Sequence, residues 1–104
     1  MYVYFIRMAF VWDSKKSKSN QLKHGISFDD AFKVFDDFHI TAIDHRKDYG
    51  EPRYCTMGFL GNTKRIVLVA HTQRNGKIRI ISMRKANKRE QKIFNNHLNE
   101  VKHE

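Results

Sequence analysis

The stretch KRIVLVAHTQRNGKIRIISM, residues 64–83, decides the fold of this chain. Apolar and branched residues lie on both sides of Asn75-Gly76, the dipeptide most typical of a two-residue turn between antiparallel strands. The pattern predicts a β-hairpin with one strand over residues 64–73 and the returning strand over residues 77–83. The register of this hairpin decides which of its polar side chains share a face of the sheet.

Two registers of the hairpin are open. A two-residue turn puts Arg74 opposite Lys77 and Thr72 opposite Arg79. These four side chains then lie on one face. A three-residue loop shifts the pairing and puts His71 opposite Arg79 instead. The turn dipeptide favours the first register, in which His71 points toward Ile80 rather than Arg79. His71 is then either a buried, hydrogen-bonded core histidine or a residue with a functional role.

Helices and strands on both sides of the hairpin predict an α+β fold. Asp13 caps a first helix and Gly25 ends it. Phe28, Phe32 and Phe35 form the apolar stripe of a second, core helix. The predicted elements outside the hairpin are a strand or a pair of short strands over residues 2–12, helices over 14–25, 26–37 and 86–101, and strands over 39–44 and 53–60. We therefore expect one compact domain, an antiparallel sheet of about four strands with two helices before the main strands and one helix after them.

The charge of the chain is strongly basic and unevenly distributed. Among 104 residues, twenty Lys and Arg stand against eleven Asp and Glu, which gives a formal net charge of +9. No acidic residue occurs from residue 52 to residue 89, whereas eight of the eleven acids lie between residues 13 and 51. Such a one-sided second half attracts a polyanion, with nucleic acid as the first candidate and an anionic membrane as the second.

The remaining composition predicts a soluble, cytoplasmic, single domain over residues 1–104. The only cysteine, Cys55, has no partner for a disulfide or a CxxC metal site, which is typical of a reducing compartment. No apolar run approaches the ~20 residues that a membrane helix needs. The apolar opening of the chain also lacks the features of a signal peptide.

Motifs of metal and nucleotide enzymes are absent from the sequence. It contains no GxGxxG, GxxxxGKS/T or HExxH motif and no pair of cysteines with metal-ligand spacing. The basic half also lacks the clustered carboxylates that two-metal nucleases need beside the substrate phosphates. RNA can be cleaved without metal, because its 2′-hydroxyl is an internal nucleophile that requires only a base, an acid and cations on the phosphorane. We therefore expect no cofactor, and RNA rather than DNA as the substrate.

Arg79 is the first candidate for a site residue. It stands among apolar residues in the middle of a strand, so its guanidinium needs an anion or a carboxylate partner on the sheet face. The alternative to an anion site is an ion pair with Asp36 or Glu51. Arg84, just past the strand, is a similar candidate. Glu51 or His71 can move protons near neutral pH.

Other basic residues have two interpretations on spacing alone. Lys85, next to Arg84, is either a phosphate contact or an ordinary surface charge. Lys23 and His24 end the first predicted helix, where basic side chains complement the carbonyl end of a helix without any role in a site.

Four segments of the sequence together resemble one protein family. The resemblance lies in FVWD, KHGISFDDAFKVFDD, EPRYCTMG and VLVAHTQRNGKIRIISMRKANKRE, from about residue 10 to about residue 89. They are similar to the BrnT family of type II toxins, which pair with BrnA-type antitoxins. The resemblance implies a compact RelE-like toxin domain, over residues 8–104, that acts as an endoribonuclease and arrests translation. It also implies an antitoxin with a ribbon-helix-helix module, through which the complex binds promoter DNA.

The family pattern also assigns the candidate residues. It falls on Trp12, Lys23, His24, Gly25, Phe28, Glu51, Arg53, His71, Thr72, Arg79, Ser82, Arg84 and Ala86. The predicted catalytic residues are Arg79, Arg84, His71, Glu51 and Arg53. The predicted RNA-binding residues are Lys23, His24, Thr72, Lys77 and Lys85. Residues 1–7 precede the usual start of the family and form an N-terminal extension, either an artefact of an upstream start codon or an added edge strand.

Two other functions would use the same basic surface. A non-enzymatic nucleic-acid-binding module would bind intact RNA or DNA in a salt-dependent way. An interaction subunit would receive an acidic protein segment in a cationic groove. The leading hypothesis is a metal-independent endoribonuclease toxin, because it accounts for both the acid-free half of the chain and the resemblance.

Overall fold

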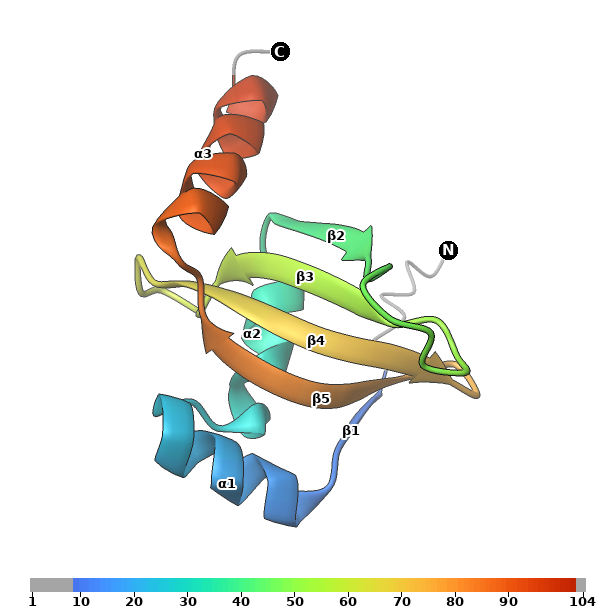
Figure 1. The fold of residues 1–104 in the computed structure, drawn as a ribbon. Helices are drawn as coiled ribbons and strands as arrows, with labels where there is room; N and C mark the ends of the chain where they lie inside the picture. Colours follow the sequence, from blue (N-terminus) through green and yellow to red (C-terminus); the bar gives the residue numbers. More distant parts are fainter. Residues whose placement is uncertain (1–8, 103–104) are drawn as a thin grey trace, which may run out of the picture.

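A computed structural model describes residues 9–102 (Figure 1). The predicted N-terminal extension, residues 1–7, lies outside the described residues, as does the part of the predicted opening strand before residue 9. The elements are β1 (Phe10–Val11), α1 (Ser14–His24), the 3-10 turn η1 (Phe28–Asp30), α2 (Ala31–Phe35), β2 (His39–Ile43), β3 (Tyr54–Phe59), β4 (Ile66–Arg74), β5 (Lys77–Lys85) and α3 (Lys88–Lys102). The class is α+β, as predicted.

The strands form one sheet in the order β1-β5-β4-β3-β2. The pairs β2–β3, β3–β4 and β4–β5 are antiparallel, whereas β1 runs parallel to β5. Over the described residues the sheet is therefore mixed and has five strands, and the prediction of an antiparallel sheet of about four strands is wrong in both respects. The parallel pair joins Phe10 to Ile78, far along the chain, so no local turn signal marks it in the sequence.

The first two helices differ in how far they follow the sequence pattern. In α1, Asp13 accepts hydrogen bonds from the first-turn backbone amides, and Gly25 ends the helix in the left-handed region at φ 71°. The second predicted helix, over residues 26–37, is shorter in the structure. Ser27 is extended and caps the 3-10 turn η1, so that only the five residues of α2 are α-helical.

One face of the sheet is covered by the N-terminal helices. The helix α1 lies against β5, and α2 lies against β3 (Figure 1). The core on this covered face consists of Ile26, Phe28, Ala31, Val34, Val67, Val69, Ile78, Ile80 and Met83. At Gly58 the approach is so close that an added Cβ would lie 2.9 Å from Val34 Cγ1. A hydrogen bond also joins α1 to β5. The side-chain oxygen of Asn20 accepts from the Met83 amide at 3.1 Å.

The opposite face of the sheet, called the open face, is covered only at one end. There α3 begins directly after β5 and inserts Phe94, which is fully buried, between Phe38 and Phe59. The ring centroids lie 5.5 and 5.1 Å from that of Phe94. In Figure 1 the rest of α3 extends away from the sheet. Nearer the β4–β5 turn, no helix within residues 9–102 covers the open face.

The β4–β5 hairpin adopts the first of the two predicted registers. Asn75 and Gly76 have φ values of 52° and 75°, as a tight two-residue turn requires, and Thr72 lies opposite Arg79. Between Ala70 and His71 the register shifts, and one extra β5 residue, Ile81, is inserted. Beyond this bulge Arg84 lies opposite Leu68, on the same face as Thr72 and Arg79. A regular strand would have put Arg79 and Arg84 on opposite faces, since their sequence separation is odd.

Candidate functional site

Three cross-strand neighbours, Arg53, Thr72 and Arg79, define a row on the open face, called the arginine row. Tyr54 stacks against His71 on the covered face, so the preceding Arg53 lies on the open face, opposite Thr72. Thr72 lies opposite Arg79 in turn. The Thr72 hydroxyl donates to the carbonyl oxygen of Pro52 at 2.9 Å, which holds the start of β3 against β4. The row therefore sets two guanidinium groups on either side of a buried threonine.

Arg79 is half-buried and has no hydrogen bond or ion pair through its guanidinium within residues 9–102. The alternative pair with Asp36 or Glu51 does not form. Glu51 instead accepts from Arg74, at 2.8 and 3.2 Å. That bond holds the pKa of Glu51 below its usual range, and the positive charges of Arg53 and Arg79 lower it further. Arg79 is thus close enough to act on Glu51 electrostatically while its own donors stay available for an anion.

Arg53 is held by an aromatic platform rather than by a carboxylate. Its guanidinium carbon lies 4.1 Å from the centre of the Tyr49 ring. The Tyr49 hydroxyl donates to Asp44, which also accepts a two-pronged bond from Arg46 with both distances at 2.9 Å. Those bonds from Arg46 keep the pKa of Asp44 well below its usual range. The buried Arg53 Nε has no hydrogen-bond partner in the described part of the chain, so this cation is oriented but not neutralised.

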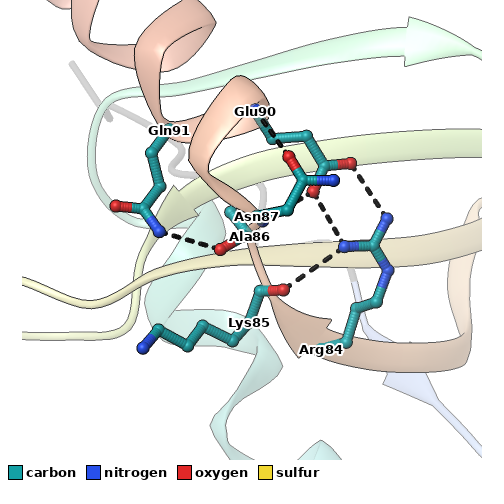
Figure 2. A network of polar contacts seen from close by, with 6 residues as sticks. All are labelled: Arg84, Lys85, Ala86, Asn87, Glu90 and Gln91. Atoms are coloured by element: carbon teal, nitrogen blue, oxygen red, sulfur yellow. Dashed lines mark hydrogen bonds and ion pairs between the residues drawn. The ribbon is translucent and has the colours of Figure 1, made fainter.

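Arg84 lies on the same face as Arg79 but has a carboxylate partner. It is four residues from the arginine row measured along β4, about 13 Å. Its two terminal nitrogens donate to Glu90 at 2.8 and 2.9 Å (Figure 2). Glu90 and Asn87 also exchange hydrogen bonds through their side chains and backbone amides, which is the capping box that starts α3. Arg84 therefore joins β5 to the first turn of α3.

His71 does not share the face of Arg79. It lies on the covered face and is 6% exposed, between the rings of Tyr54 and Phe35. Its Nε2 is hydrogen-bonded to the Thr56 hydroxyl at 2.7 Å, and Thr56 is bonded to the Thr41 hydroxyl at 2.7 Å. Burial, with a smaller effect of nearby His39, lowers the pKa of His71 to about 4.

The predicted RNA-binding residues are dispersed. Lys23 and His24 are exposed at the end of α1, on the side of the covered face. Lys77 is exposed on the open face beside the turn, opposite Arg74, and Lys85 is exposed at the far end of β5. Of this group, only Thr72 and Lys77 lie near the arginine row.

The sequence did not reveal which residues hold Arg53 in place, or that Glu51 forms an ion pair with Arg74. Tyr49, Asp44 and Arg46 belong to the loop between β2 and β3, which the sequence marks only as a turn-rich segment. Arg74 was placed on the correct face by the hairpin register, but its pairing with Glu51 depends on how that loop folds back. No pattern in the sequence would have identified these contacts.

The described residues offer neither a cluster of metal ligands nor a membrane-spanning helix. Within residues 9–102, no three His, Cys, Asp or Glu side chains are grouped so that they could hold a metal ion. None of the helices in the described part of the chain has the length and hydropathy needed to span a bilayer.

Comparison with known protein families gives a match over most of the chain. Residues 12–90, most of the 104-residue chain, match the protein family described as "Ribonuclease toxin, BrnT, of type II toxin-antitoxin system". No curated protein matches the chain. The matched region contains both strands of the hairpin and the loop that holds Arg53, and it ends at Glu90 in the first turn of α3. The resemblance drawn from the four sequence segments is thus confirmed.

Proposed function

Because this chain belongs to the BrnT family of ribonuclease toxins of type II toxin-antitoxin systems, we propose that it is an endoribonuclease that cleaves RNA through the 2′-hydroxyl without a metal ion and so arrests translation. The observation that supports this proposal is the arginine row. Arg53 is oriented but not neutralised, and Arg79 has no carboxylate partner among residues 9–102. Guanidinium groups with free donors are the natural ligands of a phosphodiester.

The reaction follows from the chemistry of RNA. The 2′-oxygen attacks the adjacent phosphorus, the bond from phosphorus to the 5′-oxygen breaks, and a 2′,3′-cyclic phosphate remains. Negative charge accumulates on the phosphorane, and we assign its stabilisation to Arg79 and Arg53. The 5′-oxygen leaves with a proton from solvent.

Glu51 is the proton acceptor in this proposal. It is the carboxylate within electrostatic range of both Arg53 and Arg79, so it lies near the phosphodiester that these two arginines would bind. His71 is less suited, because its ring nitrogen Nε2 is bonded to Thr56 on the other face of the sheet. We assign His71 to the stability of the covered face, and Arg84 to the junction with α3.

Several further properties are proposed on family grounds. A type II family implies a protein antitoxin. We propose that it is of the BrnA type, with a ribbon-helix-helix module through which the complex reaches promoter DNA. We also propose that the toxin domain is RelE-like and that it acts in the cytoplasm.

Expression of the chain alone in a bacterial host tests the proposal. Induction is expected to stop growth, and the purified protein is expected to cut RNA in excess EDTA. A substrate with 2′-deoxyribose at the cleaved position is expected to stay intact, because it lacks the nucleophile. Cleavage that requires added Mg²⁺ would disprove the metal-independent scheme. Salt-dependent binding of RNA that is never cut would favour a non-enzymatic binding module.

A further inference from the structure

The apolar stripe of α3 is longer than the part of the sheet that covers it. Phe94, Leu98 and Val101 follow one another at helical spacing on one side of α3. Phe94 is fully buried, Leu98 is half-buried, and Val101 is 52% exposed. The increase follows the path of α3, which moves away from the sheet toward its C-terminus (Figure 1). The last turns of α3 therefore present apolar side chains without a partner in the described part of the chain.

A groove continues this apolar surface onto the open face. Its lining includes Ile93 of α3 together with Ile40, Ala42, Cys55, Met57 and Leu68 of the sheet. It has a volume of about 430 Å³. Ile93 itself is 44% exposed at the edge of the groove. Groove and stripe together, called the α3 groove, form one apolar surface that a soluble monomer rarely leaves open.

Basic residues occupy the end of β5 and the first turns of α3, the helix that contributes Ile93 to the α3 groove. Lys85, Lys88, Arg89 and Lys92 are exposed, and none of them forms an ion pair within residues 9–102. An occupant that buries apolar groups in the groove would therefore bring acidic side chains to these basic residues. The groove suits a protein segment better than RNA, because its lining is mostly aliphatic and His97 is the one lining residue with a ring on which a base could stack.

We propose that the α3 groove binds an acidic, amphipathic segment of the protein antitoxin. The identity of the partner rests on the proposed function, whereas the position of the surface rests on the packing of α3. Cys55 lines the groove and lies opposite Ala70 of β4, two residues from Thr72 of the arginine row. A segment seated in the groove thus lies on the face that carries Arg79, where it would also obstruct access of RNA.

Single substitutions that introduce charge test the groove. Ile93→Glu and Val101→Glu put a carboxylate on a surface that the partner would bury, and both sites are exposed enough for the chain to fold. Leu22→Glu is the matched control, because Leu22 is 90% exposed on α1, on the other side of the sheet. Affinity is measured by calorimetry with the purified product of the gene adjacent to the gene for this chain. Each groove variant is expected to bind at least about tenfold more weakly, and the control as tightly as the wild type.

The single cysteine provides an independent readout. Cys55 labelling by N-ethylmaleimide, followed by the mass of this chain, is expected to slow when the partner is bound. An unchanged labelling rate in the complex, or wild-type affinity for Ile93→Glu, would overturn the groove assignment. The same holds if the adjacent product does not bind the wild-type chain. If the free chain self-associates and Ile93→Glu makes it monomeric by light scattering, the occupant is a second copy and the antitoxin assignment fails.

Toxicity separates this proposal from the proposed function. The groove variants are expected to arrest growth as the wild type does, and to resist rescue by the coexpressed adjacent gene. A chain that is not toxic but binds the partner through Ile93 would refute the ribonuclease proposal and support the groove. A toxic chain whose rescue is unaffected by Ile93→Glu and Val101→Glu would refute the groove alone.

Discussion

The two faces of the β4–β5 hairpin treat their polar side chains in opposite ways. On the covered face, His71 is hydrogen-bonded to Thr56 and lies between two rings. Burial lowers its pKa to about 4, so it is neutral at pH 7. On the open face, Arg79 is half-buried and its guanidinium lacks a hydrogen-bonding partner among residues 9–102. The two side chains are close in the hairpin: His71 of β4 pairs with Ile80 of β5, the residue that follows Arg79.

This difference separates stability from function within one supersecondary unit. A buried polar group that is fully bonded contributes to folding, and leaving it unbonded would be costly. A half-buried cation without a partner contributes little to folding and keeps its donors for a ligand. Substitutions on the two faces should therefore affect different measurements.

The largest effect is expected for Arg79→Ala. Loss of one preorganised donor to the phosphorane is expected to slow RNA cleavage by about 100-fold or more. The free energy of unfolding should change by less than about 1 kcal/mol, because no side-chain hydrogen bond among residues 9–102 is removed. Cleavage of a labelled RNA, measured beside urea denaturation, checks both values.

Arg79→Lys sharpens the result, since it keeps the charge and removes the planar fork. Its activity is expected to fall between those of the wild type and the alanine variant. A folded Arg79→Ala protein that cuts RNA at the wild-type rate would remove Arg79 from the mechanism. The assignment of function to the open face would then fail as well.

His71 on the covered face is expected to make the stability of the chain depend on pH. The pKa of His71 is about 4 in the folded chain against 6.5 for the free side chain. The unfolded chain therefore takes up more protons below pH 6.5, and stability falls as the pH is lowered toward 4. Between pH 7 and pH 4.5 the loss is about 2 kcal/mol, measured by urea denaturation. The carboxylates paired with arginines, such as Glu51 and Glu90, have lowered pKa values and lose their contributions only at lower pH.

His71→Gln removes this titration and is expected to flatten the stability curve in that pH window, at the cost of some stability at pH 7. His24→Gln, at an exposed position on α1, is the matched control and should keep the slope. A slope that survives in His71→Gln would mean that another group carries the pH dependence.

Much of the fold could be predicted because its signals are local. The turn dipeptide Asn75-Gly76 predicted the hairpin and its register, and with it the face of Arg79. The cap at Asp13 and the terminator Gly25 predicted α1 to within a residue. The parallel pairing of β1 with β5 was missed, since it joins segments that no turn connects.

The candidate site was predictable only in part, for the same reason. The bulge at Ile81, which returns Arg84 to the open face, depends on packing across two strands. On that face Arg84 forms an ion pair with Glu90. The sequence identifies Glu90 only as a residue of the following helix. The platform under Arg53 depends on the folded loop that carries Tyr49. Contacts of this kind are tertiary, and residue spacing does not encode them.

The two arginines of the open face differ, because Arg84 has a carboxylate partner and Arg79 has none among residues 9–102. Arg84→Ala tests this difference. It breaks the bond to Glu90 and weakens the capping box of α3, which is expected to cost about 1 kcal/mol of unfolding free energy. RNA cleavage is expected to stay within a few-fold of the wild type, because the guanidinium is already occupied. A double-mutant cycle with Glu90→Gln isolates the pair. If cleavage instead falls as steeply as in Arg79→Ala, Arg84 must exchange Glu90 for the substrate.

The smallest effect is expected for Lys77→Ala, on the open face beside the turn. Lys77 is exposed and has no ion pair within residues 9–102, so stability should change by less than about 0.5 kcal/mol. If Lys77 contacts one phosphate, the slope of log affinity against log salt falls by about 0.7 for single-stranded RNA. Lys18→Ala is the matched control, exposed on α1 at the other side of the sheet. Equal changes in slope for Lys77 and Lys18 would mean that the net charge of the whole chain attracts RNA, and the open face would lose its distinction as the binding surface.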